Sequence, residues 1–333
     1  MTHSPPPTRV LHAGDFLLDT HTGGLDGLPE PLWAVWSEAR YAAATAVFDA
    51  AVSHAVDALL LSGRLLAEVR GGAAPEGDGW NFRAAAFLSD QLRRLAAAGI
   101  PVHWHGPADQ SPRHWPASFA APVDFLSHDD DLRLAAGVPV RLRQDAVLVG
   151  DRVREVRSPQ SLGESGEHGA TLLTIGGRVA DEFIPCDTVR FHDRTIDATD
   201  GSRWDQIEKT MRSHVRQLQD EPGPAGFHAV RWGVRGHGPA WSRLHAAGPH
   251  ADLLKSVRAV AANGRTPVFA ESITPVPDET QLDRWADADH PAGAFAAAVA
   301  RVSDKPLHAP SVGRAVAVAT TLADRPAAAA SRT

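Results

Sequence analysis

The sequence predicts an α/β protein: a layered sheet with flanking helices, followed by a smaller α/β domain. Short apolar runs alternate with longer segments whose apolar residues recur about every 3.6 positions, as in strands joined by connecting helices. The 333-residue length fits two domains of ordinary size. A hydrophobic share of 43% with 22% charged residues is typical of a globular chain that buries a core.

The first five elements follow the order β-α-β-α-β, which favours parallel strands with helices on the faces of the sheet. Strands are predicted at residues 9–13, 58–61 and 100–104, and helices at residues 32–56 and 81–98. Gly99 stands where a helix C-cap glycine is expected. Such sheets bind ligands at the carboxyl ends of their strands, so the segments 15–18, 63–66 and 105–109 are the first places to look for a site.

The remainder of the chain predicts further strands and then a second α/β region. Strands are predicted at 138–143, 146–149, 169–175, 178–185, 188–192, 228–234 and 267–273, and helices at 204–219, 251–262 and 292–302. The polar stretch 193–203 is the predicted domain boundary. We therefore expect a first domain at residues 1–195 and a second at 203–305. The alanine-rich residues 323–333 are expected to form a disordered tail.

Composition excludes several classes of function. The net charge of −7 removes the simple argument for a nucleic-acid binder, because the whole-molecule field repels phosphates. Cys186 is the single cysteine, which excludes an internal disulfide and a cysteine-based zinc site. The chain has no apolar run of about 18 residues, and its polar, proline-rich start shows no secretory signal, so we expect a cytoplasmic protein without membrane contact.

The three predicted strand ends carry the residues on which a resemblance rests. Residues 11–18 read LHAGDFLL, residues 56–64 read VDALLLSGR and residues 99–109 read GIPVHWHGPAD. Later segments read RSPQ at 157–160, EHGATL at 167–172 and AVRWGVRG at 229–236. In order and spacing, the chain resembles the calcineurin-like metallophosphoesterases, and most closely the SbcD-like DNA exonuclease subunits. The resemblance implies the layered sheet with flanking helices of that family and, in the second domain, a capping-type domain.

The same resemblance implies a pair of divalent metal ions, yet most ligand positions have changed. Such a centre needs carboxylates and imidazoles, including a carboxylate that bridges the two ions. Two aspartate positions are kept, at Asp15 and Asp109. The position of the family's first histidine is Leu17, that of the bridging aspartate is Arg64, that of the asparagine is Pro107 and that of the catalytic histidine is Ala108. Residues 110–156 are short for the family and contain no Gly-His-x-His, and their alignment stays open.

We therefore expect a phosphoesterase fold whose dinuclear centre is lost, with no catalytic residue and no cofactor. An arginine is not deprotonated in a protein, so Arg64 excludes cations. Arg64 is expected to pair with Asp15 and Asp109 through charge-assisted hydrogen bonds. Loss of Arg64 would then leave buried carboxylates unpaired, at a cost of about 3–5 kcal/mol.

Two other uses of this edge stay open. A rebuilt metal site would draw on the histidines near the strand ends, His12, His21, His103 and His105, and would hold two manganese-type ions. Alternatively, Arg64 and His105, with the loop glycines Gly63 and Gly106, would bind phosphate or the DNA backbone without cleaving it.

The resemblance implies an SbcD-like subunit in DNA repair, and the changed ligand positions predict that this subunit is inactive. Such a protein would act by binding DNA or an SbcC-like ATPase partner. The alternative is an active metal-dependent phosphoesterase or exonuclease with a rebuilt metal site. A homodimer also stays open.

Overall fold

The computed structural model describes residues 7–20, 25–66, 82–115, 117, 122–126, 131–133, 139–143, 145–149, 152–176, 178–261 and 265–277. The chain divides into two units. The first unit comprises residues 1–191 together with 222–227, and the second comprises residues 192–221 together with 228–333.

A mixed sheet of six strands forms the centre of the first unit, in the order β10-β9-β1-β2-β3-β4. Its strands are β1 (Thr8–Gly14), β2 (Ala58–Ser62), β3 (Val102–His105), β4 (Asp124–Leu126), β9 (Gly169–Ile175) and β10 (Val179–Pro185). Strands β1 to β4 are parallel, whereas β9 is antiparallel to both β1 and β10. The predicted α/β class with a helix-flanked layered sheet is confirmed, and the parallel strands place their carboxyl ends at one edge.

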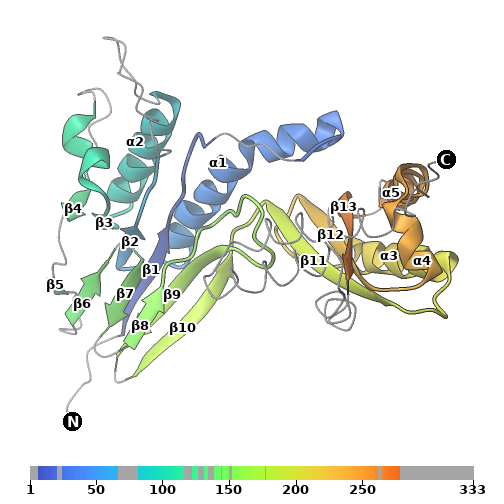
Figure 1. The fold of residues 1–333 in the computed structure, drawn as a ribbon. Helices are drawn as coiled ribbons and strands as arrows, with labels where there is room; N and C mark the ends of the chain where they lie inside the picture. The colour runs from blue at the N-terminus through green and yellow to red at the C-terminus, as the bar shows by residue number, and fades with distance from the viewer. Residues whose placement is uncertain are drawn as a thin grey trace, which may run out of the picture. The chain divides into compact units, whose positions relative to one another are not determined.

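Each face of this sheet is covered by a different layer (Figure 1). Helices α1 (Glu30–Ser53) and α2 (Phe82–Ala97) cover one face, where Leu11 and Leu59 join the helix-side core. The other face packs on an antiparallel sheet through Val10 and Leu60. That second sheet consists of β5 (Asp131–Arg133), β6 (Pro139–Leu142), β7 (Ala146–Val149) and β8 (Arg152–Glu155). Because side chains alternate along β1 and β2, each of these strands contributes residues to two separate cores.

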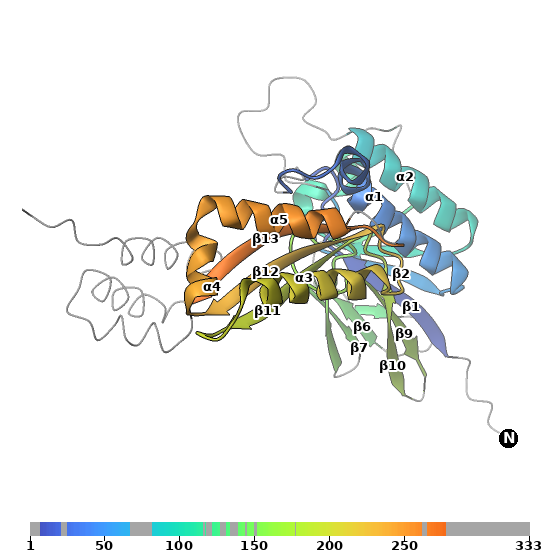
Figure 2. The same cartoon turned by 90° about the vertical axis from the view of Figure 1, so that its right-hand side faces the viewer.

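The second unit is a smaller α/β structure built on β11, β12 and β13. Its elements are β11 (Val189–Ala198), which begins in the first unit, α3 (Trp204–Gln219), β12 (Phe227–Gly236), α4 (Pro239–Ser242), α5 (Ala247–Ala261) and β13 (Val268–Pro277). Strands β12 and β13 are parallel. Helices α3 and α5 pack against each other and against the sheet (Figure 2). Their apolar faces enclose one core with Trp232 and Trp241.

The structure differs from the sequence-based expectation at residues 193–203. Strand β11 continues through this polar stretch as far as Ala198. Ile196 and Ala198 are buried, while Asp193 and Asp197 are exposed, which is the period of a half-buried strand. Residues 193–198 of the polar stretch are therefore part of a strand, and the two compact units divide between residues 191 and 192.

Several expectations fall on parts of the chain that the structure does not describe. The predicted helix 292–302, the tail 323–333 and the end of the predicted second domain beyond residue 277 lie outside the described residues. Within the described part of the chain, no helix combines the length and the apolar character needed to cross a bilayer.

Candidate functional site at the ends of three parallel strands

Backbone hydrogen bonds join the segments that follow β1, β2 and β3. The Asp15 N–H donates to the Ser62 carbonyl at 3.1 Å, and the Gly63 N–H donates to the His105 carbonyl at 2.9 Å. The Leu17 N–H donates to the Arg64 carbonyl at 3.2 Å. The structure therefore brings the predicted site segments together at one edge of the sheet.

Asp15 is held firmly at this edge by the chain itself. Its φ of 47° lies in the left-handed region, which aspartate tolerates better than most residues. Its Oδ1 accepts a hydrogen bond from the Arg64 N–H at 2.9 Å, and its carbonyl accepts one from the Ser158 hydroxyl at 2.9 Å. Burial raises the pKa of Asp15, and the hydrogen bond and the positive charge of Arg64 oppose that increase. One carboxylate oxygen is thus already occupied by backbone.

The predicted pairing of the Arg64 side chain with Asp15 and Asp109 is confirmed only in part. Its Nη1 lies 3.4 Å from the Asp109 Oδ2, and its backbone, rather than its guanidinium, makes the hydrogen bond to Asp15. The Arg64 side chain is 30% exposed and that of Asp109 is 65% exposed. The expected loss of about 3–5 kcal/mol assumed buried carboxylates and is too large, because a pair this exposed contributes about 0–1 kcal/mol.

The other positions that the resemblance assigns to metal ligands carry no metal-binding side chain. Leu17 has a φ of 48° and an aliphatic side chain. Pro107 is extended and precedes a short 3-10 helix, Ala108–Gln110, in which Ala108 is exposed. At the positions that the resemblance assigns to metal ligands, the structure has the carboxylates of Asp15 and Asp109 and the guanidinium of Arg64. These residues do not fit a pair of divalent ions.

The histidines near the strand ends have separate surroundings. His12 is 1% exposed, and its Nε2 lies 2.9 Å from the Ser62 hydroxyl. Burial lowers the pKa of His12 to about 4. The Nδ1 of His103 lies 3.0 Å from the Asp124 Oδ2, and His105 is buried. Among the described residues these imidazoles form no metal-binding group of three, and His21 lies outside the described part.

The loop glycines make room for neighbouring side chains. A Cβ on Gly63, whose φ is 70°, would lie 2.2 Å from the Asp15 Oδ1. A Cβ on Gly106 would lie 2.5 Å from the Trp104 Nε1, which donates to the Gly63 carbonyl at 3.1 Å. Because the Gly63 N–H already donates to a carbonyl, it is not directed at an anion. Phosphate binding by Arg64 and His105 stays a prediction without support from Gly63.

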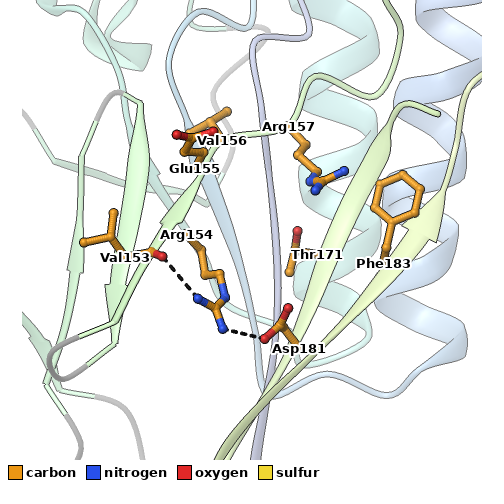
Figure 3. Close-up of a pocket in the computed structure, with 8 residues that line it drawn as sticks. All are labelled: Val153, Arg154, Glu155, Val156, Arg157, Thr171, Asp181 and Phe183. Carbon is orange, nitrogen blue, oxygen red and sulfur yellow. Dashed lines mark hydrogen bonds and ion pairs between the residues drawn. The ribbon is translucent and has the colours of Figure 1, made fainter. Parts of the chain in front are cut away.

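A separate pocket of about 480 Å³ lies between β8 and the β9–β10 hairpin (Figure 3). Arg154 binds Asp181 at 2.6 Å across it, and the Arg157 guanidinium lies 4.9 Å from the centre of the Phe183 ring. The lining includes two arginines, one glutamate and one aspartate, so its formal charges balance. Its lining contains neither Asp15 nor Asp109, and the pocket is therefore distinct from the strand-end site.

Two polar clusters were not anticipated from the sequence. Arg190, 2% exposed, donates to both carboxylate oxygens of the fully buried Asp187, at 2.7 and 2.9 Å. Arg190 also lies 2.9 Å from the Glu167 Oε1. The second cluster is formed by His192, Glu221 and His228 in the second unit. In the sequence, the charged Arg190 within the apolar run VRFH could have indicated the Arg190–Asp187 cluster. No local spacing in the sequence indicates the cluster of His192, Glu221 and His228.

Comparisons with known proteins find similarity to metallophosphoesterases over part of the chain. Residues 191–275 match the family described as metallophosphoesterase YhaO, middle domain. The chain is also 34% identical over 186 residues to the uncharacterized metallophosphoesterase YhaO of Bacillus subtilis (strain 168). Over the matched residues the chain is therefore similar to metallophosphoesterase YhaO. The match covers 53% of this chain and 43% of that relative, so the chain spans less than half of the relative's length.

Proposed function

We propose that this chain is a metallophosphoesterase-like protein that acts by binding a protein partner and does not hydrolyse phosphodiesters. The observation that supports it is Arg64 at the position of the bridging carboxylate, with its N–H on Asp15 and its guanidinium 3.4 Å from Asp109. Two divalent ions at this edge would lie beside a permanent positive charge. Their mutual repulsion would also lack the carboxylate that offsets it.

The resemblance to SbcD-like subunits supplies the class of partner, an SbcC-like ATPase, and the setting of DNA repair. The net charge of −7 favours a protein partner over DNA as the primary contact. The tag-free chain, mixed with the SbcC-like ATPase of the same genome, should elute as a complex in size-exclusion chromatography with light scattering. Separate elution of the two proteins, together with direct binding of the chain to DNA, would contradict this choice of partner.

Metal counting and an activity assay test the loss of catalysis. Tag-free protein is equilibrated with Mn²⁺, its ions are counted by mass spectrometry, and hydrolysis of bis-p-nitrophenyl phosphate and of single-stranded DNA is measured. We expect no turnover above the protein-free rate and an ion count that Asp15→Ala and Asp109→Ala leave unchanged. Two bound ions with turnover that both variants abolish would show an active phosphoesterase instead.

A reversion experiment tests which residues account for the lost centre. Arg64→Asp alone should not produce hydrolysis, because Leu17, Pro107 and Ala108 still supply no ligand or catalytic group. The matched variant combines Arg64→Asp with Leu17→His, Pro107→Asn and Ala108→His, and the same phosphodiester assay compares the two. Turnover with Arg64→Asp alone would show that the charge of Arg64 is the sole obstacle.

A further inference from the structure

We propose that the second unit binds one zinc ion through His192, Glu221 and His228. Each of these residues offers a ligand atom, and the three atoms all lie within 4.8 Å of one another. The His192 Nε2 and the His228 Nδ1 are 3.0 Å apart. This group lies in the second unit and shares no residue with the strand-end site, so its test is independent of the proposed function.

The three ligands come from well-fixed positions in the fold. His192 lies on β11 and His228 on the neighbouring strand β12. The backbone N–H of His228 donates to the Pro267 carbonyl at 3.0 Å. Glu221 follows the end of α3, and its N–H donates to the Leu218 carbonyl at 3.2 Å. Adjacent strands therefore fix both imidazoles, and a helix end fixes the carboxylate.

The chemistry of this ligand set favours zinc. Two imidazoles and one carboxylate are a known zinc-binding combination that leaves the fourth tetrahedral position to water. Zinc–nitrogen bonds of about 2.05 Å at a tetrahedral angle separate two nitrogens by roughly 3.3 Å, so the observed 3.0 Å needs only a small opening. Glu221 is half-buried, and a carboxylate oxygen lies within 4.8 Å of the ligand nitrogen of each histidine. Its negative charge offsets half of the charge of the ion.

Burial makes the group suited to a bound ion. His192 is 9% exposed and His228 is 2% exposed, and their ring centres lie 5.0 Å apart. Without an ion, one imidazole donates a hydrogen bond to the other, so the ring that accepts it is neutral. Neutral imidazole is also the form that coordinates a metal, so on metal binding the donor ring gives up the N–H between the two rings and the two nitrogens move apart slightly.

The test uses the full chain without a histidine tag, stripped by a chelator. Zn²⁺ is titrated by calorimetry, and Co²⁺ is added separately as a probe whose visible absorption reports tetrahedral coordination. We expect one ion per chain and a visible Co²⁺ band. His192→Asn and Glu221→Gln should each weaken binding at least roughly tenfold and remove the band. Asp220→Asn, next to Glu221, is the matched control and should leave both readouts unchanged.

The outcomes separate this proposal from the proposed function. Circular dichroism first checks that the variants are folded. If His192→Asn does not fold, Glu221→Gln, which changes a half-buried position, tests the site instead. Zinc binding weaker than about 10 µM, or binding that Asp15→Ala and Asp109→Ala abolish while Glu221→Gln does not, would overturn the site. Binding that depends on Glu221 and His192 supports it, whether or not the strand-end edge proves inactive.

Discussion

At the scale of single residues, Gly63 and Gly99 form a matched pair. Both have positive φ, 70° and 76°, but a Cβ on Gly63 would lie 2.2 Å from the Asp15 Oδ1, whereas a Cβ on Gly99 meets nothing within 4 Å. Gly63→Ala should therefore lower the free energy of unfolding by about 1–3 kcal/mol more than Gly99→Ala, which bears the backbone strain alone. Urea unfolding of both variants measures the difference. Equal losses would show that Asp15 moves aside at no cost.

The buried side chain of His12 gives the first unit a pH dependence. Burial lowers the pKa of His12 from 6.5 to about 4. Between these values the unfolded chain binds a proton at His12 and the folded chain does not, so the stability present above pH 6.5 is lost as pH falls toward 4. The loss should reach about 3 kcal/mol. Urea unfolding at pH 7.5 and pH 4.5 should show a smaller loss for His12→Gln than for the wild type, and identical losses would contradict the assignment.

At the scale of elements, the sequence predicts what periodic apolar residues encode. Helix α3 runs over the predicted residues 204–219 because its apolar positions repeat with the period of a helix. Strand β7 runs over the predicted 146–149, where the sequence is a short continuous apolar run. Strand β11 is longer than predicted because its outer face is polar, and three-residue strands such as β4 are too short to show a period. Pairing across the sheet, rather than local sequence, defines these elements.

Near the connection between β10 and β11, Arg190 contacts two acidic residues that differ in exposure. Asp187 is fully buried against Arg190, whereas the Glu167 side chain is 56% exposed. Asp187→Ala leaves the Arg190 guanidinium buried without its bidentate partner and should cost about 3–5 kcal/mol. Glu167→Ala should cost less than about 1 kcal/mol. Thermal unfolding of both variants checks this order, and a Glu167 effect as large as that of Asp187 would contradict it.

At the scale of the whole molecule, the strand-end site and the histidine cluster differ in how far sequence can reveal them. Asp15, Arg64 and Asp109 each follow a parallel strand, and the rule that these ends share one edge is enough to bring the three residues together. The rule does not predict how exposed the side chains of Arg64 and Asp109 are. The expected loss of stability on removing Arg64 is therefore too large. His192 and His228 meet through the pairing of β11 with β12, and no local pattern in the sequence pairs those strands.

The charge of the whole chain leads to a prediction about DNA. With 33 basic and 40 acidic side chains, the net charge of −7 opposes the approach of a polyanion, and release of counterions by a few arginines does not outweigh it at physiological salt. Fluorescence anisotropy with a labelled duplex of about 30 base pairs in about 150 mM salt should therefore give a Kd weaker than roughly 10⁻⁴ M. Lowering the salt should strengthen binding only slightly, because few phosphate contacts form. Submicromolar affinity with a steep salt dependence would mean that a local basic surface dominates the total charge, and DNA would then replace the ATPase as the expected partner.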